Sequence, residues 1–115
     1  MGDTTLHGLA EARSLAYHTA IAARIRREPA LIEPVAARLR TQLASDDPHR
    51  SYWAEAWLRV LEQPLEECLA FLTDPGERAT EMRQSTPFAG LLPAKERWTL
   101  HKQVREQWRR EGRLP

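Results

Sequence analysis

Apolar residues recur every three or four positions along most of the chain, which is the spacing of one face of an α-helix. The longest such stretch is predicted to begin near Thr4 or Thr5 and to end at Glu28, because Pro29 disfavours helical geometry in the residue before it. The face of this helix that is predicted to be buried consists of Leu15, His18, Ile21, Ala22 and Ile25.

Prolines divide the rest of the chain into shorter predicted helices. The next helix is expected before the polar loop at 45–49, and Pro34 inside it predicts a kink or a fresh start. A third helix is expected at about 50–63, and a fourth follows Pro64. Their apolar stripes, in order, are Ile32, Val35, Leu39 and Leu43, then Trp53, Trp57, Val60 and Leu61, then Leu65, Cys68, Leu69 and Leu72.

A short fifth helix is predicted to start at Asp74, whose carboxylate is expected to cap it with Glu77 as the capping-box partner, and to end near Ser85. Residues 86–92 are apolar but contain proline and glycine, so they are expected to be irregular and either to fill the core or to contact a partner. A last helix is predicted from about 93 to 111. The fold class is therefore predicted as all-α, a compact bundle of five to six short helices joined by proline-containing turns, with one domain over residues 1–115.

Composition narrows the protein class further. The chain has 115 residues and a net charge of +1, so its total charge does not favour nucleic acid or a membrane surface. A single cysteine excludes an internal disulfide and suits a reducing compartment. No apolar run approaches the roughly 20 residues that span a bilayer, and the N-terminus lacks the pattern of a signal peptide. These features predict a cytoplasmic protein without a membrane partner.

No residue pattern predicts catalysis, a metal site or a cofactor. The histidines at 7, 18, 49 and 101 do not pair at helical spacing, and His18 on an apolar face is expected to be a hydrogen-bonded core residue. Cys68 lies among leucines and is expected to pack as a small hydrophobic residue. The adjacent carboxylates Glu66 and Glu67 would point about 100° apart on a helix instead of converging. We therefore expect a protein that is not an enzyme.

The positions of charged residues and tryptophans along the chain are more informative about a partner than the net charge is. Residues 95–113 contain seven basic and three acidic side chains, a net charge of +4, whereas residues 50–74 contain two basic and five acidic ones, a net charge of −3. The usual explanation for such runs is a solvated helix face. The alternative is a basic last helix that meets an acidic protein surface or a phosphate backbone. Trp98 lies off the apolar stripe of that helix and suits either packing or an interface.

The stretch Met82–Leu92, followed by Glu96, Arg97 and Trp98, resembles the MenA-like family of short helical antitoxins, which are encoded beside small nucleotidyltransferase toxins. Residues 11–18 and 53–57 are also similar to that group. The resemblance implies a type II antitoxin whose partner is a cognate nucleotidyltransferase toxin. Such a protein binds its toxin directly and stops it from transferring nucleotides onto an acceptor such as tRNA.

The residues themselves suggest where such a partner would bind. Pro87 and Gly90 are expected to fix a turn that presents apolar anchors, while the arginines would pair with acidic groups of a metal-dependent transferase. The predicted partner-binding residues are Arg83, Pro87, Phe88, Leu91, Leu92, Arg97 and Trp98. The alternative functions are a nucleic-acid-binding transcriptional autorepressor that uses the basic last helix, and a generic helical adaptor.

Overall fold

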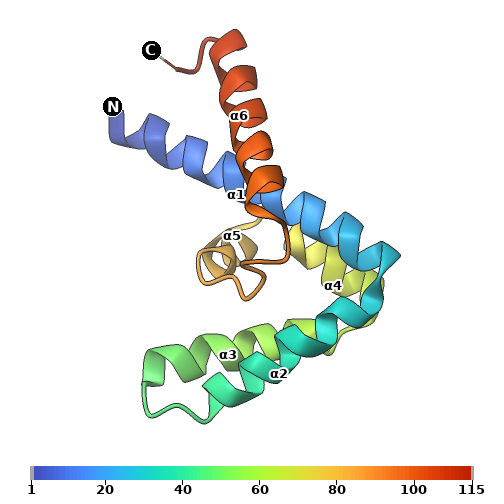
Figure 1. Ribbon diagram of the computed structural model, residues 1–115. Coiled ribbons are helices and arrows are strands. Elements are labelled where there is room, and N and C mark those ends of the chain that lie inside the picture. The colour runs from blue at the N-terminus through green and yellow to red at the C-terminus, as the bar shows by residue number, and fades with distance from the viewer. Residues whose placement is uncertain (1, 115) are drawn as a thin grey trace.

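The computed structural model describes residues 2–114, with side chains from residue 7 onward. Its elements, in chain order, are α1 (Gly2–Arg27), the 3-10 turn η1 (Pro29–Leu31), α2 (Ile32–Leu43), α3 (Pro48–Leu61), α4 (Leu65–Leu72), α5 (Glu77–Arg83) and α6 (Ala94–Arg110) (Figure 1). No strand occurs within residues 2–114, so the prediction of an all-α fold is confirmed, although α1, with 26 residues, is longer than the short helices expected. Within the same range, no helix has the length and apolar character needed to cross a membrane.

Prolines set the boundaries between the first three helices. α1 ends just before Glu28, whose φ of −142° leaves helical geometry immediately ahead of Pro29. The chain then makes η1 and starts α2 afresh, so that Pro34 falls in the first turn, where its missing N–H breaks no helical hydrogen bond. The prediction of a kink or a fresh start is thus resolved as a fresh start. In α3, Asp47 caps the helix by accepting the backbone N–H of His49 at 2.9 Å.

The start of α5 differs from the prediction. Asp74 does not cap this helix, because its Oδ1 accepts the backbone N–H of Gly76 at 2.7 Å, two residues on, in the turn that precedes α5. Gly76 itself occupies the capping position and makes no side-chain bond, and Glu77 is the first helical residue instead of the third. The Asp74 carboxylate that the predicted capping box required is therefore already bonded within the turn at Pro75.

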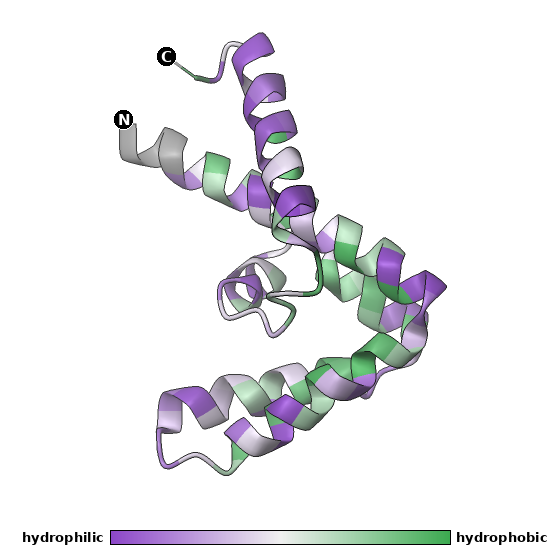
Figure 2. Ribbon diagram, viewed as in Figure 1, coloured by the Kyte–Doolittle hydropathy of each residue, from purple (hydrophilic) through white to green (hydrophobic). Residues whose placement is uncertain are grey.

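The helices share one core. α2 and α3 form an antiparallel hairpin at one end of the molecule, α4 packs against the second half of α1, and α6 projects at the opposite end (Figure 1). Apolar colour concentrates where α1, α2, α3 and α4 meet, whereas α6 is mostly hydrophilic (Figure 2). The largest fully buried apolar side chains are Trp57, Phe88, Ile21, Ile25, Leu69, Leu72 and Val35.

Phe88 closes this core from the irregular segment between α5 and α6. Its side chain is 0% exposed. Its ring packs edge to face against Trp57 of α3, with centroids 5.6 Å apart, and against His18 of α1, with centroids 6.2 Å apart. Leu92, a few residues on, is also buried. Of the two alternatives for the apolar stretch, core filling is therefore confirmed for these two side chains.

α6 is attached along a single stripe. None of its side chains is fully buried, but the predicted residues Leu100, Val104 and Trp108 are half-buried on one side. At the far end of this stripe, Gly8 of α1 permits a close approach, since a Cβ at that position would lie 2.9 Å from the Trp108 ring. The attachment of α6 to α1 therefore depends on partial burial and on this contact.

Replacing Phe88 with alanine should destabilise the whole fold. Phe→Ala in a closed core typically lowers the free energy of unfolding by about 3–5 kcal/mol, because apolar contacts are lost and a cavity remains. We expect this loss in urea unfolding followed by circular dichroism. Leu43→Ala is the control, because Leu43 is 42% exposed on α2 and should cost less than about 1 kcal/mol. Similar losses in both variants would contradict the role assigned to Phe88.

Candidate functional site

The irregular segment 84–93 is bound to α1 by two neighbouring side chains. The hydroxyl of Tyr17 donates to the backbone carbonyl of Phe88 at 2.8 Å. Nε2 of His18 is bonded to the hydroxyl of Thr86 at the same distance of 2.8 Å. Because Tyr17 and His18 are adjacent on α1, one turn of that helix fixes both sides of the bend that carries the buried phenylalanine.

Two arginines hold the remainder of the segment. Nη1 of Arg24, also on α1, donates to the carbonyl of Leu91 at 2.7 Å. Nη2 of Arg38, on α2, donates to the carbonyl of Pro87 at 3.0 Å. These bonds satisfy carbonyls that have no partner in regular structure, which a segment with buried residues requires. The segment is thus a fixed part of the fold.

His18 is a neutral, structural histidine. It is 1% exposed, and its Nδ1 is 2.7 Å from the carbonyl of Ser14, which can only accept. Nδ1 therefore carries the proton, and Nε2 accepts the hydrogen bond from Thr86. Burial lowers the pKa of His18, the bond to Ser14 opposes this, and the charge of Arg83 lowers the pKa further. The prediction of a hydrogen-bonded core histidine is confirmed.

The structure divides the seven predicted partner-binding residues among the interior, the edge and the surface. The buried ones are Arg83, Phe88 and Leu92. The half-buried ones are Pro87 and Leu91, and the exposed ones are Arg97 and Trp98. A buried side chain does not reach the surface of a partner that docks onto the folded chain. Burial therefore removes these three from the predicted contact surface, while contact of Pro87, Leu91, Arg97 and Trp98 with a partner stays a prediction.

Arg83 is buried because it joins the end of α4 to α5. Its Nη1 donates to the carbonyls of Asp74 at 2.7 Å and Leu72 at 3.3 Å, and its Nη2 donates to the hydroxyl of Thr80 at 3.1 Å. The Leu72 carbonyl lies at the C-terminus of α4, where the helix dipole favours a positive charge. This explains how an arginine is accommodated at 4% exposure without a carboxylate among the described side chains.

Trp98 belongs to a basic face of α6. It is 64% exposed, more than any other large hydrophobic side chain in the described part of the chain. Lys102, Arg105 and Arg109 follow it at intervals of four, three and four residues, so the four side chains share one side of the helix. All four are exposed, and Arg109 pairs with Glu106 at 2.7 Å. We call these four residues the outward face of α6.

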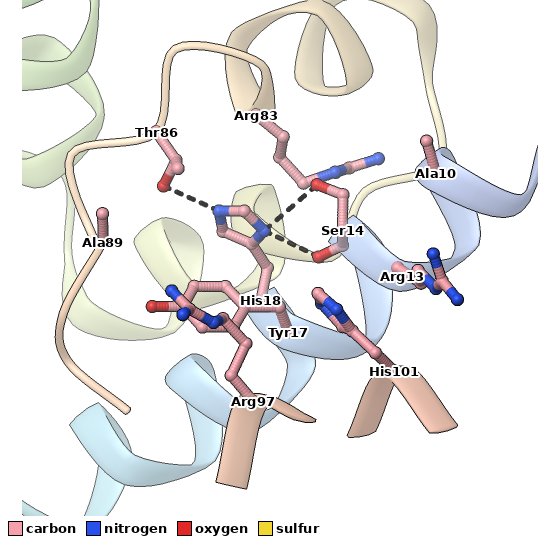
Figure 3. Close-up of a pocket in the computed structure, with 10 residues that line it drawn as sticks. All are labelled: Ala10, Arg13, Ser14, Tyr17, His18, Arg83, Thr86, Ala89, Arg97 and His101. Atoms are coloured by element: carbon pink, nitrogen blue, oxygen red, sulfur yellow. Dashed lines mark hydrogen bonds between the residues drawn. The ribbon is translucent and has the colours of Figure 1, made fainter. Parts of the chain in front are cut away.

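A pocket of about 360 Å³ lies on another side of α6, between α1, α5 and the segment 84–93 (Figure 3). Its basic and histidine lining consists of Arg13, His18, Arg83, Arg97 and His101, and no carboxylate lines it. Partial burial lowers the pKa of His101, and the positive charges of Arg13 and Arg97 lower it further. The pocket is therefore electropositive. Sequence reasoning missed it because the arginines are distant in the chain.

Neither a metal site nor an exposed thiol is found among the described residues. Within that part of the chain, no three histidine, cysteine or acidic side chains gather where they could hold a metal ion. Cys68 is 0% exposed, and burial raises the pKa of its thiol, which keeps it protonated. Its predicted packing in the core is confirmed, as is that of Trp57.

Comparisons with protein-family models, with curated proteins and with solved structures find no match to this chain. Two surfaces of α6 are candidate sites, namely the outward face with its exposed tryptophan and the electropositive pocket on the side toward α1.

The stability of the fold should fall as the pH drops below about 6.5, partly because of His18. The pKa of this histidine is lowered from 6.5 in the folded chain, so the unfolded chain binds more protons just below that pH. Its contribution is complete above pH 6.5 and is lost as the pH falls toward the folded-state pKa. Urea unfolding between pH 7.5 and 5.5 measures this slope. His18→Gln should flatten the slope, and an unchanged slope would contradict the assignment.

Proposed function

We propose that this protein is an antitoxin that binds a cognate nucleotidyltransferase toxin directly and neutralises it by contact, without chemistry of its own. The observation that carries the proposal is the outward face of α6, where Trp98 is 64% exposed among three basic side chains on a helix with no fully buried residue. The resemblance of residues 82–92 and 96–98 to antitoxins supplies the class of partner. The proposal assigns the protein to the cytoplasm, where nucleotides and tRNA are available.

The chemistry of this face suits an acidic partner surface. Tryptophan and arginine are the residues most enriched at binding hot spots, because they provide large contact areas together with polar groups. A nucleotidyltransferase that uses divalent metal ions must hold acidic side chains at its active site. A basic helix that covers this site would be favoured by charge complementarity and would block access of nucleotide or acceptor. The outward face of α6 is therefore the proposed inhibitory surface.

The segment 84–93 has a supporting role in this proposal. Its buried side chains and its hydrogen bonds to α1 and α2 fix the position from which α6 departs. Pro87 and Leu91, which are half-buried, provide a smaller apolar contact at its edge. Arg97 faces the pocket between α1 and α6, so its contribution to a partner bound on the outward face is expected to be minor.

Trp98→Ala should weaken the complex with the proposed cognate nucleotidyltransferase by about 30-fold or more, as expected when a hot-spot side chain is lost. Isothermal titration calorimetry with the purified toxin measures the affinity, and nucleotide transfer to tRNA measures neutralisation. Leu43→Ala removes an exposed apolar side chain from α2 and serves as the matched control. Wild-type protein that neither binds nor inhibits the toxin would refute the proposal. Equal effects of both variants would refute the assigned surface.

A nucleic-acid-binding autorepressor is the second candidate, and the row of basic side chains on the outward face favours it. Phosphate-backbone contacts predict binding to the protein's own promoter that falls steeply between 50 and 200 mM salt. In that case Lys102→Ala and Arg105→Ala should weaken binding more than Trp98→Ala does. A mobility-shift titration separates the two candidates, because a protein interface centred on Trp98 predicts the opposite order for toxin binding.

A further inference from the structure

Three arginines line the pocket between α1 and α6, and no acidic side chain lines it. Arg13 enters from α1, Arg83 from α5 and Arg97 from α6 (Figure 3). Considering only side chains that the structure describes, none of the three forms an ion pair. Each of five other arginines does so with a glutamate, namely Arg26, Arg59, Arg78, Arg109 and Arg113. The charge of Arg83 is stabilised by the C-terminal end of α4, whereas no acidic side chain at the pocket balances Arg13 and Arg97.

The same pocket holds unused hydrogen-bond donors. Nε of Arg13 and Nε of Arg83 are buried and have no hydrogen-bond partner among the described residues. Folded proteins leave few buried polar groups unpaired, because an unpaired donor loses its bond to water without compensation. Arg83 is 4% exposed. Its Nη atoms donate to the carbonyls of Leu72 and Asp74 and to the hydroxyl of Thr80. Both arginines line the same pocket, and an acceptor bound there would reach these two buried nitrogens after a shift of the side chains.

We propose that this pocket binds the phosphate group of a small phosphate monoester. Guanidinium groups form paired, charge-assisted hydrogen bonds with phosphate oxygens, and Arg13 and Arg97 line the pocket from α1 and α6, on either side of His18 (Figure 3). The hydroxyl of Ser14 lies on the same wall, 3.5 Å from the proton-bearing Nδ1 of His18, so its own proton remains available to a ligand. A dianion balances the charges of two arginines better than a single carboxylate does.

The size and walls of the pocket favour a ligand with an organic part. Its volume of about 360 Å³ falls in the range of small-molecule sites and exceeds what a bare phosphate would fill. Tyr17, Ala10 and Ala89 provide apolar wall surface beside the charged groups. A nucleoside monophosphate combines the two features and is the probe that we choose.

The existence of this site does not depend on the proposed antitoxin role. Arg97 and His101 face the pocket, whereas Trp98 and Lys102 lie on the outward face of the same helix. The proposed inhibitor function can therefore fail while phosphate binding holds, and the reverse is also true.

Isothermal titration calorimetry of the full chain with adenosine monophosphate, inorganic phosphate and adenosine tests the site. We expect saturable binding of the first two, tighter for the nucleotide, and none for adenosine. Arg13→Gln and Arg97→Gln should each weaken binding about tenfold or more, since each removes charge-assisted hydrogen bonds. Arg40→Gln on α2 makes the same change in net charge away from the pocket and should alter affinity less than twofold. Arg83 is left intact because it closes α4.

A second readout is the titration of His101 followed by nuclear magnetic resonance. The charges of Arg13 and Arg97 lower its pKa in the free protein, so a bound dianion should raise it. The proposal would be overturned by absence of saturable phosphate binding, by equal losses in Arg40→Gln and Arg97→Gln, or by adenosine binding as tightly as its monophosphate. Equal affinity for glutarate would also overturn it, because the site would then select a carboxylate.

Discussion

A segment without regular structure that carries buried side chains needs hydrogen-bond partners outside itself, and this constraint fixes the path of the chain between α5 and α6. Segment 84–93 satisfies it through the hydroxyl of Tyr17, the imidazole of His18 and the guanidinium groups of Arg24 and Arg38. With those groups in place, the ring of Phe88 can enter the core. Tyr17 and His18 are therefore as important to the fold as the apolar residues around them.

The same hydrogen bonds determine which surfaces of α6 are accessible. Because the preceding segment is fixed, α6 leaves the core at a defined point and lies along α1 by a half-buried stripe. One side of the helix then meets arginines of α1 and α5 to form an electropositive pocket, while another carries an exposed tryptophan and three basic side chains. A single polar helix thus presents two surfaces of different chemistry, one concave and suited to a small anion, the other convex and suited to a macromolecule.

Local patterns in the sequence predicted the helices well because prolines and apolar spacing act over a few residues. They also predicted the buried roles of His18, Cys68 and Trp57, which lie on apolar stripes. They did not predict that Arg83 would be buried, since its partners are backbone carbonyls at the end of another helix. The two alternatives for residues 86–92, core filling or partner contact, stayed open for a similar reason, because distant residues decide whether a turn is covered. The pocket escaped notice because Arg13 and Arg97 meet only in the folded chain.

The partial burial of α6 has a thermodynamic consequence. A terminal helix with no fully buried side chain can detach from α1 at a cost well below that of global unfolding. Detachment would dismantle the wall that Arg97 and His101 contribute, so occupancy of the cavity and the docked state of the helix are linked equilibria. A solute held at the junction would keep the helix in place, and a macromolecule that prefers the docked helix would in turn hold the solute more tightly.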